Sequence, residues 1–499
     1  MPMVKVRPIE DDISIVSFNY DDVKIGNDKD GDAREEVCDE KVDENKKKVE
    51  KKKRNRVSRF FSTWTSTVPE AVGVTGLRYI TSSQDSILRR FVWYVAIFGG
   101  MGALFYQATD RAVYFVGNYK TVDVDIEYGS ELVFPAITIC NYNTFRNLDL
   151  DSLPFGQMLS ELNGFIPTPV NYTHYAILMG DINATELYLS LAHIMDHGEM
   201  FNFGTWDGFT FITPQVFTRV ITDFGVCHTF NGGFDGEELR KVQVAGKGHG
   251  LSLLLDVQQY HYYYSKSLQY SAGVVVAIHD QDDIPLVESF GLAVAPGTEA
   301  RIGIKKRQVN NLPPPYGVCG SRDLKYFSSP YSMHKCQREC LIDYIQASCG
   351  CVEPYMAVSD NMTVCNPAII FSCVHFLAYK LNVKDECDCP VTCESTTYTT
   401  SLSYSRMPSD FYSQKLLDYV AELGHAVEED HFLANSVMLQ LYFEEMTTEV
   451  ITQREAYTFF AFLCDIGGSM GLWLGGSILT IVEIFDHLFQ IAFIEGATK

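Results

Sequence analysis

Basic side chains are scarce in this sequence. Its 499 residues hold 40 Lys plus Arg against 63 Asp plus Glu, which gives a formal net charge of −23. Nearly all of the excess lies between residues 110 and 455, where there are 21 basic and 42 acidic side chains. Because phosphate binding needs clustered Lys and Arg, this balance argues against a nucleic-acid partner and suits a surface that gathers cations.

Motifs for common catalytic sites are also missing. The chain has no P-loop, no H-E-x-x-H sequence and no dinucleotide-binding fingerprint. Gly467–Gly471 (GGSMG) matches the G-x-S-x-G nucleophile motif, but that motif needs a strand-turn-helix context and here it lies inside an apolar stretch. We therefore predict that the protein is not an enzyme and has neither a cofactor nor a resident metal ion.

Cysteines, by contrast, are abundant in one block. Of 14 cysteines, 12 lie between Cys140 and Cys393, ten of them from Cys319 onward. An even, dense set indicates a disulfide framework in an oxidising compartment. A zinc site is the competing interpretation, although the usual paired C-x2-C spacing is missing. Three N-x-[ST] sequons in the same block agree with an extracellular segment. They are Asn171, Asn183 and Asn361.

Two apolar stretches flank this block. The run from Phe91 to Tyr106 has no charge, and the stretch from Phe459 to Phe485 is interrupted by Asp465 and Glu483. A secretory signal peptide is not plausible, because the first 87 residues are polar. Buried core helices are the alternative to membrane spans, but the flanked, sequon-bearing block favours two spans. We place them at residues 88–109 and 456–488.

Positive charge sets the orientation of the spans. Lys and Arg cluster between residues 46 and 59, and Arg89 and Arg90 precede the first span. The positive-inside rule then places both termini, residues 1–87 and 489–499, in the cytosol and residues 110–455 outside. Residues 1–60 are expected to be largely disordered. The Lys run is either a solvated patch or a contact with anionic membrane lipid.

The second span contains polar groups that are costly in a membrane. Asp465 and Glu483 are 18 residues apart, a whole number of turns, so a continuous helix would carry both on one face. The glycines before Ser477 could let the helix open and turn backbone carbonyls toward a water-filled lumen. Close helix packing through small residues explains them equally well. Two spans cannot enclose a lumen, so a pore implies an oligomer.

Several segments closely resemble the degenerin/epithelial sodium channel superfamily, over roughly residues 70–490. They are FPAITICNYNTFR (134–146), TDFGVCHTFN (222–231), FGLAVAPG (290–297), LPPPYGVC (312–319), the cysteine array to Cys393, and CDIGGSMGLWLGGSILTIVEIF (464–485). The resemblance implies a homotrimer in the plasma membrane. Each subunit would have two transmembrane helices and a large disulfide-rich α+β ectodomain with a β-rich palm and helical finger and thumb regions.

The resemblance also implies roles for individual residues. The selectivity tripeptide falls on Gly475, Gly476 and Ser477, the outer acidic position on Asp465, and the position where bulky residues hold relatives open on Cys464. Glu483 is the second acidic residue expected along the pore. The family's cytosolic His-Gly pair aligns with Thr75 and Gly76, so the imidazole is absent here.

The cysteine pairing that the family implies uses all 12 cysteines of the block. The pairs are Cys140–Cys227, Cys319–Cys393, Cys336–Cys389, Cys340–Cys387, Cys349–Cys373 and Cys351–Cys365.

The opening stimulus is less directly encoded. Acid-sensing relatives carry a histidine pair after the first span, where this chain has Tyr119 and Lys120, so the most direct proton switch is missing. Carboxylate runs such as Asp282-Asp283 or residues 428–430 could still respond to acid. The segment 196–211 instead interleaves aromatic and acidic side chains, which suits a short cationic, aromatic peptide, although the rings could simply fill a core. The candidate binding residues are Phe201, Phe203, Trp206, Asp207, Phe209 and Phe211.

We therefore expect a sodium-selective channel that is opened by an extracellular FMRFamide-like amidated neuropeptide and is sensitive to amiloride, as in the invertebrate neuropeptide-gated branch of the superfamily. The alternatives are an acid-gated or constitutively active sodium channel of the same superfamily, and a cell-surface adhesion or scaffold protein.

Overall fold

The computed structural model describes residues 86–162, 169–180, 182–208, 210–263, 271–328, 330–359, 362–382, 386–422, 424, 428, 430–477, 479–486 and 489. These residues fall into two compact units, one within Met1–Ala112 and Phe460–Lys499 and the other Val113–Phe459. The larger unit corresponds closely to the predicted ectodomain. Residues 1–85, including Thr75 and Gly76, lie outside the described part, as do Phe209 and Asn361.

The smaller unit contains most of two apolar helices and a third, shorter one. The helix α3 (Ile87–Val116) is long and apolar enough to cross a membrane, judged by length and composition. It extends seven residues beyond the C-terminal end of the predicted span. The helix α14 (Phe459–Leu474) is followed, after a break, by a second helix at Leu479–Asp486, and the two are bent by 76°. This bend corrects the expectation of one continuous helix in the second span.

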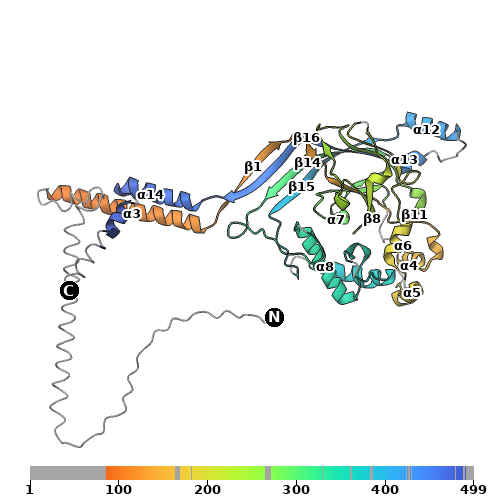
Figure 1. The fold of residues 1–499 in the computed structure, drawn as a ribbon, viewed down its shortest axis with the longest axis horizontal. Helices are drawn as coiled ribbons and strands as arrows, with labels where there is room; N and C mark the ends of the chain where they lie inside the picture. The colour runs from red at the N-terminus through yellow and green to blue at the C-terminus, as the bar shows by residue number, and fades with distance from the viewer. Residues whose placement is uncertain are drawn as a thin grey trace, which may run out of the picture. The chain divides into compact units, whose positions relative to one another are not determined.

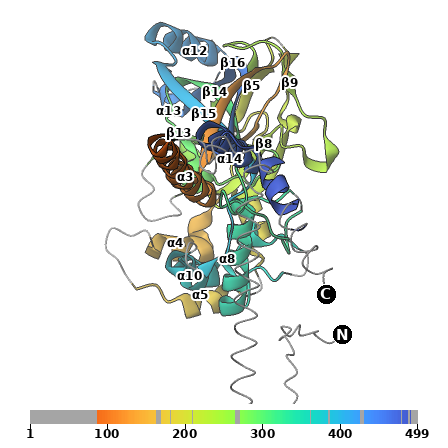
Figure 2. The same cartoon turned by 90° about the vertical axis from the view of Figure 1, so that its left-hand side faces the viewer.

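The larger unit contains two main β-sheets (Figures 1 and 2). The larger sheet has the order β15-β14-β16-β10-β5-β6, and β1 also pairs with β16. The second sheet has the order β13-β12-β3-β8-β7. The strands of the first sheet are β1 (Lys120–Tyr128), β5 (Phe201–Trp206), β6 (Thr210–Phe211), β10 (Gly250–Asp256), β14 (Thr298–Asn310), β15 (Glu394–Arg406) and β16 (Ser436–Glu455). Those of the second are β3 (Ala136–Asn141), β7 (Phe217–Thr222), β8 (Gly225–Phe230), β12 (Val274–His279) and β13 (Leu292–Val294).

Alternating apolar side chains of both sheets form one shared core. On β10 the buried residues Leu251, Leu253 and Leu255 recur every second position, which is the period of a strand with one buried face. The β3 strand is buried along its whole length. Aromatic rings from four segments close one end of this core, with ring centroids 4.9–6.5 Å apart. They are Phe134, Trp206, Phe230 and Phe443.

A second core belongs to the helices. It joins α4, α5 and α6 to α8 and to the α9–η6–α10 segment. In both views α4, α5 and α8 lie on the opposite side of the sheets from α12 (Asp410–Glu422) (Figures 1 and 2). The remaining bounds are α4 (Pro154–Leu162), α5 (Tyr172–Met179), α6 (Ala184–Leu191), α7 (Val287–Phe290), α8 (Met333–Cys349), η5 (Pro354–Met356), α9 (Pro367–Ile369), η6 (Ile370–Val374), α10 (His375–Lys380) and α13 (His431–Asn435). The short pairs are β2 (Leu132–Val133) with β9 (Lys241–Val242) and β4 (Phe145–Arg146) with β11 (Tyr262–Tyr263).

Six disulfides staple the larger unit. They are Cys140–Cys227, Cys319–Cys393, Cys336–Cys389, Cys340–Cys387, Cys349–Cys373 and Cys351–Cys365, the same six pairs that the family resemblance implies. Five of them hold α8 and its flanking loops, a region with few strands of its own. Cross-links of this kind restrict the unfolded chain and so stabilise the folded region.

Candidate ion pathway and ligand cavity

The break after α14 falls on the predicted selectivity tripeptide. Gly475 has a φ of +63°, in the left-handed region, and its amide donates to the Gly471 carbonyl at 3.1 Å. This is a common way for a helix to end, and glycine takes that conformation without the strain of a side chain. The next helix is started by Ser477, whose amide donates to Thr480 Oγ1 at 2.9 Å. Residues 475–477 therefore form a turn between two helices.

The predicted acidic residues lie on opposite sides of this turn. Asp465 is in α14, where its carbonyl accepts a hydrogen bond from the Ser469 hydroxyl at 2.7 Å. Glu483 is in the helix beyond the break. The bend means that the two carboxylates do not share one face of one straight helix. Cys464 is exposed and is a free thiol.

The predicted peptide-binding residues that the structure describes are not brought together in one cleft. Phe201 and Trp206 are only 1% and 7% exposed and belong to the shared core of the sheets. Phe203 and Phe211 are exposed and contact each other edge to face, 5.5 Å between centroids. The Asp207 carboxylate contacts His249 Nδ1 at 3.1 Å. These two buried rings fill a core, which is the alternative given above, and they do not line an open cleft.

A β-bulge explains why Phe201 is buried whereas Phe203, two residues later, is exposed. The pairing of β5 with β10 shifts register between Leu254 and Leu255, which lie opposite Phe203 and Phe201. On a regular strand, two residues that are two positions apart lie on the same face. A register shift between them places them on opposite faces.

A different cavity, of about 520 Å³, has the chemistry that the peptide prediction called for. It lies in the larger unit, between the β7–β8 hairpin, α6, α7 and the α9–η6–α10 segment. Aromatic rings and carboxylates from these separate segments line it. They are Phe145, Tyr188, Phe224, Tyr355, Phe371 and Tyr379, with Asp223, Glu288 and Glu353.

Polar groups in this cavity have unusual environments. Burial raises the pKa of the Asp223 carboxyl, although the Val287 amide donates to it at 3.1 Å. Glu353 pairs with His375 Nε2 at 3.4 Å. The Thr144 hydroxyl is buried and has no hydrogen-bond partner among the described residues. Buried polar atoms are usually satisfied, so this hydroxyl is a candidate to bind a ligand.

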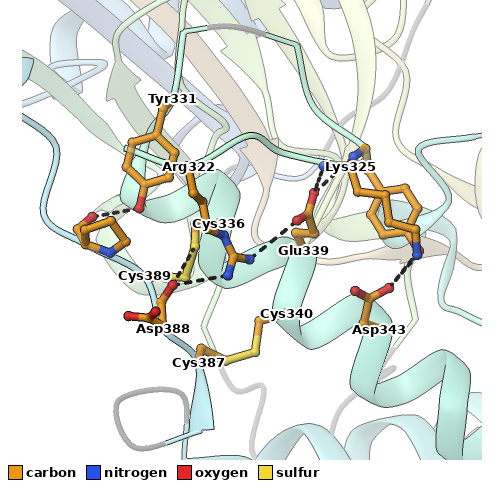
Figure 3. A network of polar contacts seen from close by, with 12 residues as sticks. Arg322, Lys325, Tyr331, Cys336, Glu339, Cys340, Asp343, Cys387, Asp388 and Cys389 are labelled. Atoms are coloured by element: carbon orange, nitrogen blue, oxygen red, sulfur yellow. Dashed lines mark hydrogen bonds and ion pairs between the residues drawn. A yellow bond between two sulfur atoms is a disulfide. The ribbon is translucent and has the colours of Figure 1, made fainter. Parts of the chain in front are cut away.

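The α8 helix beside this region is held by a buried carboxylate that the sequence did not single out. Glu339 is only 5% exposed. As Figure 3 shows, its carboxylate accepts from Arg322 at 3.4 Å and also from the Lys325 amide. The Tyr326 amide donates to it at 3.0 Å. The disulfides Cys336–Cys389 and Cys340–Cys387 join the same helix to a later segment, so α8 is held by hydrogen bonds to the loop before it and by covalent bonds to residues 387–389.

The sequons in the described part lie at helix starts. Asn171 Oδ1 accepts from the His174 amide at 3.1 Å, and Asn183 Oδ1 accepts from the Thr185 amide at 2.9 Å, so each caps a helix. Both residues are exposed. The capping bonds use the side-chain oxygen, whereas a glycan is attached through the nitrogen.

Comparisons with known proteins agree on a family. The model of the amiloride-sensitive sodium channel family matches residues 70–487. Acid-sensing ion channel 1C of Danio rerio is 33% identical, and the alignment covers 83% of this chain and 81% of that protein. Acid-sensing ion channel 2 of Homo sapiens is 31% identical, with 83% and 84% covered, and acid-sensing ion channel 1 of Gallus gallus is 30% identical, with 83% and 82% covered.

A solved structure of a proton-activated chloride channel aligns with a TM-score of 0.30 at 7% identity, covering 80% of this chain and 96% of that one, a similarity too low to indicate a shared fold. The three relatives above are named as ion channels, in line with the prediction that the chain is not an enzyme. With the disulfide-bonded, β-rich ectodomain and the broken apolar helix, the match over most of the sequence establishes that this chain belongs to the amiloride-sensitive sodium channel family.

Proposed function

We propose that this sodium channel is opened by an extracellular FMRFamide-like neuropeptide. The observation that carries the proposal is the 520 Å³ cavity, which combines aromatic rings with three carboxylates. A peptide that ends in Arg-Phe-amide offers a guanidinium for the carboxylates and a ring for the aromatic walls. Ligand pockets of about 300–1,000 Å³ are usual for small ligands, so the cavity is large enough for such an end.

Acid is the second candidate stimulus, because the relatives named above are acid-sensing channels. The segment after α3 offers little for it. Tyr114 stacks on Tyr119 with centroids 4.9 Å apart and contacts Tyr457 edge to face at 5.3 Å. Lys120 binds Gln453 at 3.3 Å. Histidine is the side chain that ordinarily changes charge near neutral pH, and the chain has no histidine at these two positions.

The ion pathway in this proposal is formed by three copies of the chain, with Gly475, Gly476 and Ser477 selecting the ion and Asp465 and Glu483 along the route. The turn at residues 475–477 supports the assignment, since backbone that has left the helix can present carbonyls to an ion. Both termini are cytosolic, the channel lies in the plasma membrane, an amiloride-type blocker closes it, and Asn171 and Asn183 carry glycans.

Electrical recording from cells that express the chain tests the stimulus. FMRFamide applied outside should evoke a current whose reversal potential follows external Na⁺, whereas a step to pH 5 should not. A current evoked by acid and not by FMRFamide or related amidated peptides would overturn peptide gating in favour of the acid-gated alternative. A current with neither stimulus applied would favour a constitutively active channel.

Cavity variants test where the peptide binds. Asp223→Asn and Glu353→Gln should each raise the half-maximal FMRFamide concentration about tenfold or more, because hydrogen bonds to charged groups contribute about 1.5–3 kcal/mol. The matched control is Glu186→Gln, an exposed carboxylate on α6 that does not line the cavity. Equal sensitivity of all three variants to the peptide would contradict binding in this cavity.

A further inference from the structure

A polar contact joins the two helices of the smaller unit. The indole nitrogen Nε1 of Trp473, in the last turn of α14, donates to Gln107 Oε1 on α3 at 3.0 Å. An amide side chain without a hydrogen bond destabilises an apolar span. The bond to Trp473 therefore offsets the free-energy cost of placing Gln107 in this helix.

A second contact lies two helical turns away on the same face of α3. Gly100 is buried, and a Cβ atom added to it would lie 2.8 Å from the Trp473 carbonyl oxygen. Gly100 and Gln107 are seven residues apart, which places them on one face of an α-helix. The α3 helix therefore touches both the backbone and the side chain of Trp473.

Trp473 lies two residues before the turn at residues 475–477. In a continuous helix its carbonyl would accept from the amide of Ser477, but that amide donates to Thr480 Oγ1. Gly475, two residues after Trp473, already has left-handed backbone. The Gly476 amide likewise donates to the Met470 carbonyl and not to that of Leu472, so the regular hydrogen bonding of α14 ends in the helical turn that contains Trp473.

We propose that Gln107 is a positioning residue for ion selection and that it acts by holding Trp473, which fixes the backbone of the turn at residues 475–477. The inference rests on the proposed function, in which this turn selects the ion. Without the hydrogen bond, Trp473 can take other rotamers and the turn can take more than one arrangement, which weakens discrimination between Na⁺ and K⁺.

Reversal potentials with Na⁺ outside and K⁺ inside test the inference in full-length channels. The two variants are Gln107→Met, which keeps the length of the side chain and removes the acceptor, and Trp473→Phe, which keeps an aromatic ring and removes the donor. Each should lower the Na⁺/K⁺ permeability ratio about threefold, the factor that corresponds to the average of about 0.6 kcal/mol for a hydrogen bond between transmembrane helices. The double variant should fall no further than either single one, because the same bond is lost.

The control is Thr109→Val. Thr109 lies close to Gln107 on α3, but its hydroxyl donates to the Phe105 carbonyl of the same helix at 2.8 Å, so its loss breaks no contact with α14. Its permeability ratio should match that of the unmodified channel. Surface labelling accompanies each recording, and if one member of the pair fails to reach the membrane, the other breaks the same bond.

Three results would overturn the inference: an unchanged ratio in both single variants, fully additive changes in the double variant, or reduced surface expression with an unchanged ratio, which would indicate a packing role alone. Ser477→Ala is recorded in the same session. If it shifts the ratio while the pair does not, the inference fails and the selectivity assignment stands. If it leaves the ratio unchanged, the selectivity assignment itself is wrong.

Discussion

A buried histidine in the second sheet should make the ectodomain less stable in acid. His228 on β8 is 4% exposed, and its Nε2 accepts the Met195 amide at 3.3 Å, so the neutral ring carries its proton on Nδ1. Burial, together with the positive charge of Arg219, lowers the pKa of His228 from its usual 6.5 to about 3. Protonation in the folded state would place a second N–H against the Met195 amide and a charge in the core.

The size of the effect follows from the two pKa values. Because the pKa of His228 is lower in the folded chain than in the unfolded one, the unfolded chain binds the proton more readily and the free energy of unfolding falls as the pH falls. The contribution of His228 is complete above about pH 7 and is lost progressively toward pH 3. At pH 5 the loss is about 2 kcal/mol, provided that the folded ring is still neutral.

Thermal unfolding of the solubilised full-length channel measures this loss. For a unit of this size about 2 kcal/mol corresponds to a shift in Tm of about 3 °C. His228→Gln keeps an oxygen that can accept from Met195 but cannot titrate, so the fall in Tm between pH 7.5 and 5 should be smaller by about that amount. His197→Gln, which removes an exposed imidazole, should behave like the unmodified chain. An equal fall in Tm for His228→Gln and the unmodified chain would refute the reasoning.

Two further pairs of substitutions test the α8 helix and the turn at residues 475–477. Glu339→Gln should lower the free energy of unfolding by about 2–4 kcal/mol, because it weakens a buried, charge-assisted set of hydrogen bonds. Asp343→Asn, on the exposed side of the same helix, should lower it by less than about 1 kcal/mol. Thermal unfolding compares the two variants, and equal Tm values would contradict a stabilising role for the buried carboxylate. Gly475→Ala should strain the turn by about 1–2 kcal/mol and change single-channel conductance, because alanine is unfavourable in left-handed backbone. Gly468→Ala adds a Cβ with no atom within 4 Å and should leave conductance unchanged. Equal conductance in both variants would contradict a role for the turn in ion conduction.

Local sequence patterns predicted the elements that depend on short stretches of chain. The first apolar run became α3, and the glycine pair before Ser477 became the end of a helix, because a glycine with left-handed backbone is a local property. The disulfide pairs were expected from the family resemblance, since spacing alone leaves many connectivities open.

Features assembled from distant segments could not be predicted in the same way. The aromatic segment around Phe201 and Phe203 was recognised, but its faces depend on a bulge against β10. The cavity near Asp223 gathers residues from separate parts of the chain, and no single stretch carries its composition. Glu339 reads as an ordinary surface residue of a polar helix, and only its contacts with the loop before α8 reveal that it is buried.

The placement of β16 has a consequence for how the protein is made. This strand pairs with β1 more than 300 residues earlier, and with β14, whose last residue is Asn310. A ribosome adds about 5–20 residues per second, so after Asn310 the chain grows for roughly 7–30 seconds before Glu455 emerges. Until then the large sheet lacks its central strand and leaves the edges of β1, β10 and β14 open. The cysteine-rich segment between Cys319 and Cys393 is synthesised within this interval. Its disulfides can therefore form while the sheet is incomplete, and until β16 is made those open edges can pair with other chains.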